Sequence, residues 1–171
     1  NLFKNKNKKI IIEIGPGNGE NLLFLANKYP RRKIIGIEPF KNGLANIADI
    51  CLQNKKNNIF LYPFIFQKFT TKFKNYFFEQ CYILFPDPWP KKKHQKRRLI
   101  DYISLKDLIS HCSSKGSIFF SSDNEDYFRD VRSYALKMKK VVKITVKSYK
   151  KTPTIITKYH NRALKLKNNV N

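Results

Sequence analysis

The stretch from Lys9 to Gly19 reads KIIIEIGPGNG. A short, continuous run of β-branched residues that is bounded by glycines is typical of a strand buried in a parallel sheet. Glycines directly after such a strand let the backbone turn tightly, and they let a ligand approach closely because no Cβ intervenes. The stretch therefore predicts a strand over 9–14 and a turn that opens a helix over 20–29.

Strands and helices alternate outward from this stretch. The pattern predicts further strands over 33–37, 59–66, 80–85 and 116–121, helices over 42–53, 99–112 and 124–140, and late strands around 141–149 and 154–159. This alternation predicts an α/β fold with a doubly wound, mainly parallel sheet (Rossmann-like), in which the late strands are antiparallel. No repeat or Ser/Pro-rich linker interrupts the chain, so we expect a single domain over 1–171.

The chain is strongly basic. Its 171 residues include 35 Lys and Arg against 12 Asp and Glu, a formal net charge of +23. Hydrophobic residues at 42% and aromatic residues at 14% exclude a wholly disordered chain. A compositional bias toward Lys, Asn and Ile, as an AT-rich genome imposes, accounts for part of the basicity. The remainder favours a polyanionic partner, nucleic acid ahead of a membrane surface.

The cysteines and histidines are few and scattered. They are Cys51, Cys81, Cys112, His94, His111 and His160. None of their spacings is that of a metal site or of a disulfide framework, so we expect no metal and a reducing, cytoplasmic location. No apolar run approaches the ~20 residues of a membrane span, and we expect no membrane partner.

The glycine-rich turn carries a specific spacing. Gly15, Gly17 and Gly19 form G-x-G-x-G, whereas a dinucleotide site requires G-x-G-x-x-G, whose last position is Glu20 here. Glu13 and Glu20 flank the turn and disfavour a pyrophosphate, while they favour a cationic ligand. The turn therefore disfavours an NAD-dependent oxidoreductase.

Glu38 ends the second predicted strand. A carboxylate at this place can accept two hydrogen bonds from a ribose diol. A glycine turn with a second-strand acid and no phosphate-binding device predicts S-adenosylmethionine as the ligand. The alternative is a tight turn and an exposed acid without a ligand.

The fourth predicted strand runs into a stiff and basic segment. Three prolines between Leu84 and Lys91 fix φ around Asp87 and Trp89. Six of the eight residues from Lys91 to Arg98 are basic, which is a greater concentration than compositional bias explains. Phosphates are the natural counterpart of such a run.

Three strings carry a resemblance to a known family. LFPDPWPKKKHQKRR from Leu84 to Arg98, with EIGPGNG before it and TKYHNR after it, resembles the bacterial tRNA (guanine-N7)-methyltransferase family over most of the chain. The resemblance implies a class I methyltransferase fold, S-adenosylmethionine as methyl donor, and N7 of the variable-loop guanosine of tRNA, position 46, as acceptor. It therefore implies an RNA-binding enzyme of tRNA modification.

The same motifs assign roles to individual residues. By resemblance, the cofactor would contact Glu13, Glu38 and Asp87 beside the turn of Gly15, Gly17 and Gly19, and Asp87 would also be the catalytic residue. The substrate would contact Lys91, Asp123, Thr157, Lys158, Tyr159, His160 and Arg162. Simpler alternatives are a helix cap for Asp123 and an edge strand for Thr157 and Lys158.

The chain departs from the family pattern at two places. The stretch from Leu61 to Phe66, at the end of the third predicted strand, contains no acid or amide, and the first such residue is Gln67. The adenine amino group therefore lacks the side-chain acceptor that is usual in the family. His160 stands where the family has Glu, and it is a poorer acceptor for the guanine N–H edge. These departures leave two alternatives open, a methyltransferase with another RNA target and a degenerate domain that binds tRNA without catalysis. The family's N-terminal arm is also absent, which suggests a fragment of a longer or fused protein, and the oligomeric state stays open.

Overall fold

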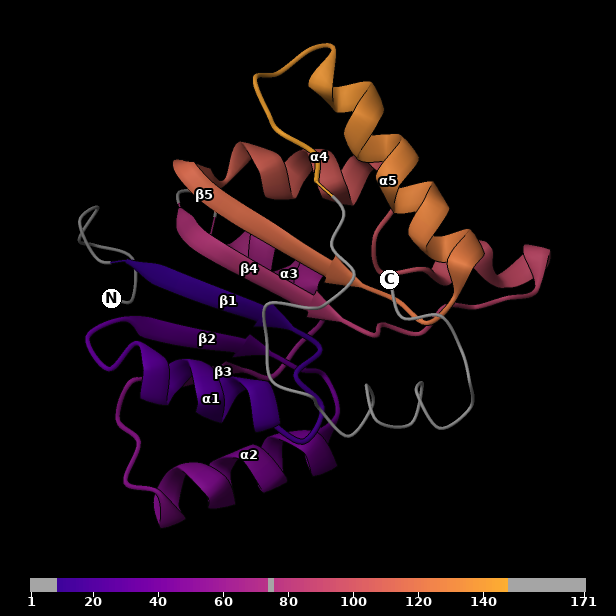
Figure 1. Ribbon diagram of the computed structural model, residues 1–171. Coiled ribbons are helices and arrows are strands. Elements are labelled where there is room, and N and C mark those ends of the chain that lie inside the picture. The colour runs from indigo at the N-terminus through magenta and orange to yellow at the C-terminus, as the bar shows by residue number, and fades with distance from the viewer. Residues whose placement is uncertain (1–8, 74–75, 148–171) are drawn as a thin grey trace. The chain divides into compact units, whose positions relative to one another are not determined.

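The computed structural model describes residues 9–73 and 76–147. Its elements in chain order are β1 (Ile10–Ile14), α1 (Glu20–Lys28), β2 (Lys33–Ile37), α2 (Lys41–Gln53), β3 (Ile59–Tyr62), α3 (Phe66–Lys72), β4 (Phe78–Leu84), the 3₁₀ helix η1 (Lys92–Arg97), α4 (Tyr102–Ser110), β5 (Cys112–Ser121) and α5 (Glu125–Lys139). Figure 1 shows how these elements follow one another.

The chain divides into two compact units. The sheet unit comprises Asn1–Leu84 and His111–Phe119, and the helical unit comprises Phe85–Ser110 and Phe120–Asn171. The sheet unit holds β1 to β4 and most of β5, whereas the helical unit holds η1, α4 and α5. The expectation of a single domain over 1–171 stays a prediction.

The sheet confirms the predicted fold class. Its strand order is β3-β2-β1-β4-β5, and β1 pairs in parallel with both β2 and β4. The chain moves outward from β1 to β3 and then returns to β4, so the order reverses between β1 and β4. In doubly wound sheets a ligand binds beyond the carboxyl ends of the strands at such a switch point. Glu13 lies in register with Gly36 of β2 and Tyr82 of β4.

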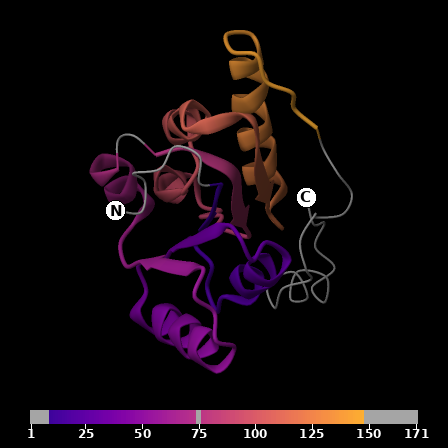
Figure 2. The same ribbon diagram turned by 90° about the vertical axis from the view of Figure 1, so that its left-hand side faces the viewer.

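The core of the sheet unit explains why a run of isoleucines forms the central strand. All five residues of β1 are buried, and because successive side chains of a strand point to opposite faces, both faces of β1 are covered. Helices α1 and α2 supply the side chains that pack on one face of the sheet. In Figure 2, α2 is the purple helix at the bottom. The buried cluster consists of Ile11, Leu22, Leu25, Ala26, Ile34, Ile47 and Tyr82. Burial of each large side chain in it contributes about 1.5–3 kcal/mol.

Helix α3 was not predicted from the sequence. The expected strand over 59–66 ends at Tyr62, and Pro63, which has no N–H for a sheet ladder, follows it. Phe69 of the helix packs against aromatic rings on either side of it, with its ring centroid 5.2 Å from that of Tyr62 and 4.9 Å from that of Phe73. Their high strand propensity concealed the helical spacing of Phe66, Phe69 and Phe73.

Other boundaries also differ from the predictions. The helix expected over 99–112 begins at Tyr102, because Asp101 and Ser104 form reciprocal hydrogen bonds of 2.8 Å between side chain and backbone N–H, a capping box. Strand β5 begins at Cys112 rather than at residue 116. Residues 141–147 form no strand; instead Val141 and Val142 donate back to the last turn of α5. The strand expected over 154–159 lies outside the described residues.

A substitution at Gly36 tests the packing of α1 on the sheet. A Cβ there would lie 2.6 Å from Leu22 Cδ1 and 3.2 Å from Leu61 Cδ2. We expect Gly36→Ala to lower the free energy of unfolding by about 1–3 kcal/mol, because the added methyl group overpacks the core. Urea denaturation measures the change, and Ser114→Ala at an exposed position of β5 is the control. Equal midpoints for Gly36→Ala and the native protein would contradict this packing.

Candidate functional site

The turn between β1 and α1 has a backbone conformation that glycine adopts most readily. Gly15, Gly17 and Gly19 have φ values of 71°, 56° and 82°. The Gly15 N–H donates to the Ile37 carbonyl at 2.9 Å, which ties the turn to the carboxyl end of β2. Three left-handed residues within five positions explain the G-x-G-x-G spacing. Because these three residues have no side chain, a ligand at this end of the sheet could approach the backbone of the turn closely.

Glu38 is joined to this turn by hydrogen bonds. Its Oε2 accepts from the Gly17 N–H at 3.1 Å and its Oε1 accepts from the Phe40 N–H at 3.0 Å. The side chain is only 4% exposed, so the two backbone donors hold the carboxylate in one orientation. Each oxygen retains a further lone pair that can accept from a ligand. The structure thus brings together Glu38 and the glycine turn, as the sequence suggested.

Gly43 is a residue of this site that the sequence reasoning missed. A Cβ at Gly43 would lie 2.9 Å from the Gly17 carbonyl oxygen and 3.3 Å from Glu38 Cγ. Helix α2 therefore approaches the turn closely only because this position has no side chain. The available signal was a glycine near the start of a predicted helix, where it costs stability relative to alanine and usually has a packing reason.

Glu13 is the second acid of the sheet unit, and it is in a different electrostatic environment. It is 2% exposed, and burial raises the pKa of its carboxyl from 4.5 to about 8. The nearby Asn21 offsets part of this rise. Neither side-chain polar atom of Asn21, nor Glu13 Oε2, makes a hydrogen bond of ordinary geometry to the described residues. Glu13 and Asn21 are therefore buried polar groups with capacity for a ligand, and Asn21 was not identified from the sequence.

The region after β3 carries apolar side chains. Phe64 and Ile65 are 45% and 47% exposed, and Phe40, which follows β2, is 71% exposed. Because β2 and β3 are paired in parallel, both segments leave the same end of the sheet. Rings and alkyl groups thus stand where the sequence lacks a polar acceptor.

Asp87 lies in the helical unit, in the segment after β4. Its side chain is exposed, and the flanking Phe85 and Trp89 have positive φ values of 51° and 43°. Such values are uncommon for bulky residues, so the surrounding structure must hold this backbone in place. The Phe85 N–H donates to the Ser121 carbonyl at 2.9 Å, which provides one such restraint.

The basic run forms η1 and packs beside Trp89. The Arg97 guanidinium lies 5.0 Å from the Trp89 ring centroid, and the His94 ring meets that indole edge-on at 5.9 Å. Lys91 is exposed at the start of η1. The run therefore presents cations next to an aromatic ring.

Asp123 is also in the helical unit, but it does not cap a helix. The cap of α5 is Asn124, whose Oδ1 accepts from the Tyr127 N–H at 2.9 Å. The capping alternative for Asp123 is therefore wrong. The remaining substrate residues expected from the sequence, Thr157, Lys158, Tyr159, His160 and Arg162, lie outside the described residues.

The described part of the chain holds neither a metal-ligand cluster nor a membrane-spanning helix. Within residues 9–73 and 76–147, no three His, Cys, Asp or Glu side chains are grouped as a metal site requires. Cys51, Cys81 and Cys112 are free thiols. No helix in this described part of the chain has the length and apolar character needed to cross a membrane.

Comparison with known proteins places these features in a family. Residues 7–171 match a protein-family profile described as "Putative methyltransferase". The chain is 37% identical over 162 residues to a protein of Wolbachia pipientis wMel named tRNA (guanine-N(7)-)-methyltransferase, covering 94% of this chain and 72% of that protein. It is 34% identical to a bifunctional methyltransferase of Rickettsia prowazekii, of which it spans 32% of the length.

Solved structures are similar in fold. A precorrin-6y C5,15-methyltransferase from Geobacter metallireducens has a TM-score of 0.60 at 12% identity, covering 80% of this chain and 65% of that one. The plantazolicin methyltransferase BpumL in complex with SAH has a TM-score of 0.52 at 16% identity, covering 74% and 43%. At these identities the likeness concerns the fold alone.

The raised pKa of Glu13 predicts a dependence of stability on pH. Between pH 4.5 and about 8 the folded protein retains a proton that the unfolded chain loses, so the free energy of unfolding falls as pH rises. The decrease is at most about 1.4 kcal/mol per pH unit. We expect Glu13→Gln, which resembles the protonated acid, to flatten this slope in urea denaturation between pH 5 and 8. Glu125→Gln, at an exposed position, controls for the lost charge, and an unchanged slope in Glu13→Gln would contradict the assignment.

Proposed function

Because the chain belongs to the methyltransferase family that this profile describes, we propose that it transfers a methyl group from S-adenosylmethionine to N7 of the variable-loop guanosine, position 46, of tRNA. The resemblance predicted from the sequence is thereby confirmed at the level of the family. The observation that carries the proposal is the 37% identity, over 94% of the chain, to a relative named tRNA (guanine-N(7)-)-methyltransferase.

The residues of the sheet unit fit the cofactor. Glu38 has free lone pairs for the two hydroxyl groups of a ribose, and the turn containing Gly17 offers backbone at close range. Glu13 has an acceptor without a partner among the described residues, which suits the ammonium group of the methionine part. Phe40 and Phe64 would pack against the adenine, which supplies apolar contact in place of the missing polar acceptor.

The chemistry requires little from the protein beyond orientation. The cofactor supplies a methyl group on a cationic sulfur, and guanine N7 already has a free lone pair, so no base has to remove a proton. Holding the two reactants in line can contribute roughly 7–11 kcal/mol. Asp87, three residues after the carboxyl end of β4, would orient the base through its N–H edge and stabilise the positive charge that the ring acquires. Asp87 would also contact the cofactor.

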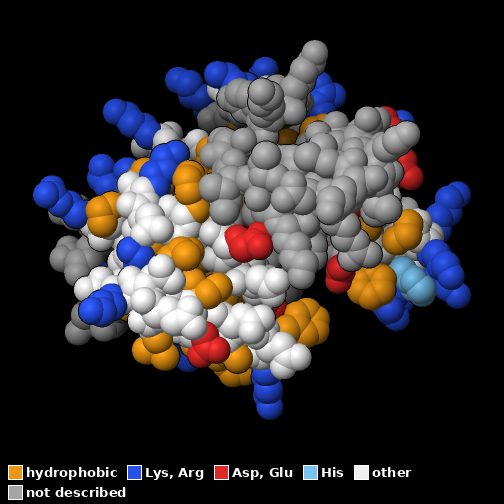
Figure 3. All heavy atoms as spheres, turned by 60° about the horizontal axis from the view of Figure 1, so that its bottom comes forward, with side chains coloured by type: hydrophobic (Ala, Val, Ile, Leu, Met, Phe, Trp, Pro, Cys, Tyr) orange, Lys and Arg blue, Asp and Glu red, His pale blue; other side chains and the backbone are white. Residues whose placement is uncertain are grey.

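The basic surface supports a tRNA partner. On the face shown in Figure 3, Lys and Arg side chains project around much of the edge. Lys91 and Arg97 would bind phosphates, and each neutralised phosphate releases counterions. Asp123 and the segment from Thr157 to His160, with Arg162, would complete the substrate site. A tRNA substrate implies a cytoplasmic location.

A second candidate is a domain that binds tRNA without catalysis. The lack of any acid or amide between Tyr62 and Gln67 favours it, since cofactor affinity would then be weaker by about 1–2 kcal/mol. Methyl transfer from labelled S-adenosylmethionine to an unmodified tRNA transcript separates the two candidates. Labelled 7-methylguanosine is expected with this transcript and not with one whose variable-loop guanosine is replaced by adenosine. Tight, salt-sensitive tRNA binding without transfer would support the second candidate.

Substitution of the catalytic residue provides a sharper test. We expect Asp87→Asn to lower the single-turnover rate of methyl transfer at least tenfold, because the neutral amide cannot stabilise the cationic ring. Cofactor affinity should change only a few-fold, since Glu13 and Glu38 remain. Asp49→Asn, at an exposed position of α2, should leave both quantities unchanged. An undiminished single-turnover rate in Asp87→Asn would remove Asp87 from the mechanism.

A further inference from the structure

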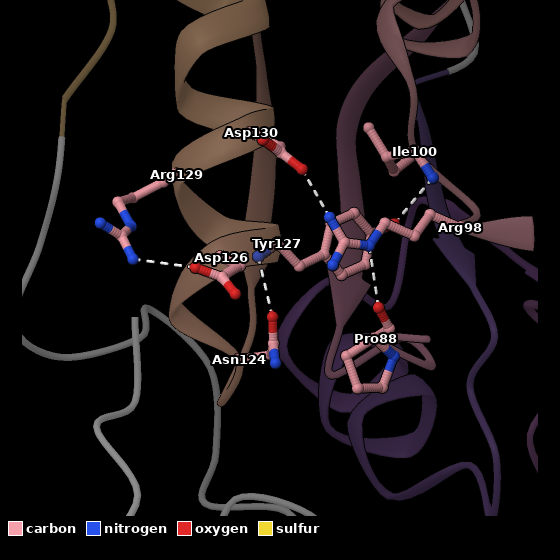
Figure 4. Close-up of polar contacts among 8 residues, drawn as sticks. All are labelled: Pro88, Arg98, Ile100, Asn124, Asp126, Tyr127, Arg129 and Asp130. Carbon is pink, nitrogen blue, oxygen red and sulfur yellow. Dashed lines mark hydrogen bonds and ion pairs between the residues drawn. The ribbon is translucent and has the colours of Figure 1, made fainter. Parts of the chain in front are cut away.

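Arg98 differs from the rest of the basic run. Lys91, Lys92, Lys93, Lys96 and Arg97 are all exposed, whereas the Arg98 side chain is 5% exposed. Arg98 directly follows η1, and its guanidinium is directed toward α5, as Figure 4 shows. A buried guanidinium needs partners for its donors. Nε and Nη1 of Arg98 have them, whereas Nη2 makes no hydrogen bond to the described residues. Its contacts therefore show what it does.

The guanidinium contacts three groups. Nε donates to the Pro88 carbonyl oxygen at 2.8 Å, and Nη1 pairs with the carboxylate of Asp130. The planar guanidinium lies 4.7 Å from the ring centroid of Tyr127. Asp130 and Tyr127 are both on α5, one turn apart. Arg98 therefore connects the Pro-Asp-Pro-Trp segment to α5 (Figure 4).

The bond to Pro88 restrains the backbone next to Asp87. Proline fixes φ at Pro86, Pro88 and Pro90, so the remaining freedom of the segment lies in the residues between them. A residue that precedes proline favours an extended backbone, yet Phe85 and Trp89 precede prolines and have positive φ. A segment in this conformation needs a restraint from outside, and the Pro88 carbonyl receives one from Arg98.

On the α5 side of this connection, Tyr127 and the start of the helix are held by further hydrogen bonds. Tyr127 is fully buried, and its hydroxyl oxygen accepts from the Ile100 N–H at 2.8 Å. The Tyr127 N–H donates to Asn124, the cap of α5, which directly follows Asp123. Asn124 N–H donates in turn to the Ser122 hydroxyl oxygen at 3.1 Å. The network therefore reaches from Pro88, beside Asp87, to the two neighbours of Asp123.

We propose that Arg98 is a positioning residue for the reaction: by holding the Pro88 carbonyl against α5 it presents Asp87 in one orientation. This inference rests on the proposed function, because it assigns Arg98 to the presentation of the catalytic carboxylate. Arg98 itself touches neither substrate nor cofactor in this role. Its counterpart on α5 is Asp130, whose side chain is 45% exposed.

The role requires arginine rather than any cation. A guanidinium can donate in two directions and stack on an aromatic ring at the same time, whereas the ammonium of lysine is a single point charge. Arg98→Lys therefore keeps the charge near Asp130 but cannot also hold the Pro88 carbonyl in the same geometry. Asp130→Asn keeps the size of the side chain and removes only the ionic partner.

The test compares these two variants with matched controls on the same helix. Asp126→Asn and Arg129→Lys alter an exposed pair of 2.9 Å on α5 that does not contact the Pro-Asp-Pro-Trp segment. Two quantities are measured in each protein: the single-turnover rate of methyl transfer at saturating cofactor and tRNA, and the time-resolved fluorescence anisotropy of Trp89. Trp89 is the only tryptophan of the chain, so it reports the order of this segment whether or not methyl transfer occurs.

We expect Arg98→Lys to lower the single-turnover rate at least tenfold and Asp130→Asn to lower it at least threefold. Affinities for cofactor and tRNA should stay within twofold, and the local motion of Trp89 should increase in both variants. The controls should match the native protein. If Arg98→Lys fails to fold, Asp130→Asn carries the test, because its side chain is half-exposed.

Two results would overturn the inference. The first is a folded variant whose methyl-transfer rate and Trp89 anisotropy equal those of the native protein, even if its urea midpoint is lower. The network would then only stabilise the helical unit. The second is a lower rate of methyl transfer that is caused entirely by weaker tRNA binding. An inactive native protein would instead reject the proposed function, while the Trp89 anisotropy would still decide whether Arg98 orders the segment.

Discussion

The burial of β1 on both of its faces is the constraint on which the rest of the sheet unit depends. A strand between two parallel neighbours can only leave the sheet at its end, and it must then turn within a few residues for α1 to cover one face. That turn uses three residues with positive φ, which glycine adopts without strain. The turn is tied to its neighbours through backbone N–H groups: that of Gly15 donates to the Ile37 carbonyl and that of Gly17 holds Glu38.

The two acids beside this turn show how the fold assigns different properties to the same side chain. Glu38 accepts from two backbone N–H groups, which hold its side chain in one orientation. Glu13 lies inside the sheet with no comparable donors, and burial raises the pKa of its carboxyl to about 8. A cationic ligand with hydroxyl and ammonium donors would satisfy both groups. A negatively charged pyrophosphate would satisfy neither.

The helical unit uses one arginine of the basic run for a separate purpose. In sequence, Arg97 and Arg98 are adjacent and equivalent, but the first is exposed over the Trp89 ring and the second is buried between Pro88 and α5. A run of like charges is usually read as one solvated surface. Here the last cation of the run is part of the interior, because the end of η1 turns it toward Asp130 and Tyr127.

The sequence by itself determined the order of strands and helices, the parallel sheet, the glycine turn and the family, because periodicity, glycine spacing and the Pro-Asp-Pro-Trp string are local signals. It did not determine α3, whose aromatic residues have high strand propensity, or the cap of α5 at Asn124. The roles of Gly43, Asn21 and Arg98 were also decided only by the tertiary structure. Two of these depend on a partner distant in the chain, Gly17 for Gly43 and Asp130 for Arg98, and the third depends on the turn that brings Asn21 back beside Glu13. Composition and spacing carry no information about which distant groups meet, since packing alone decides that.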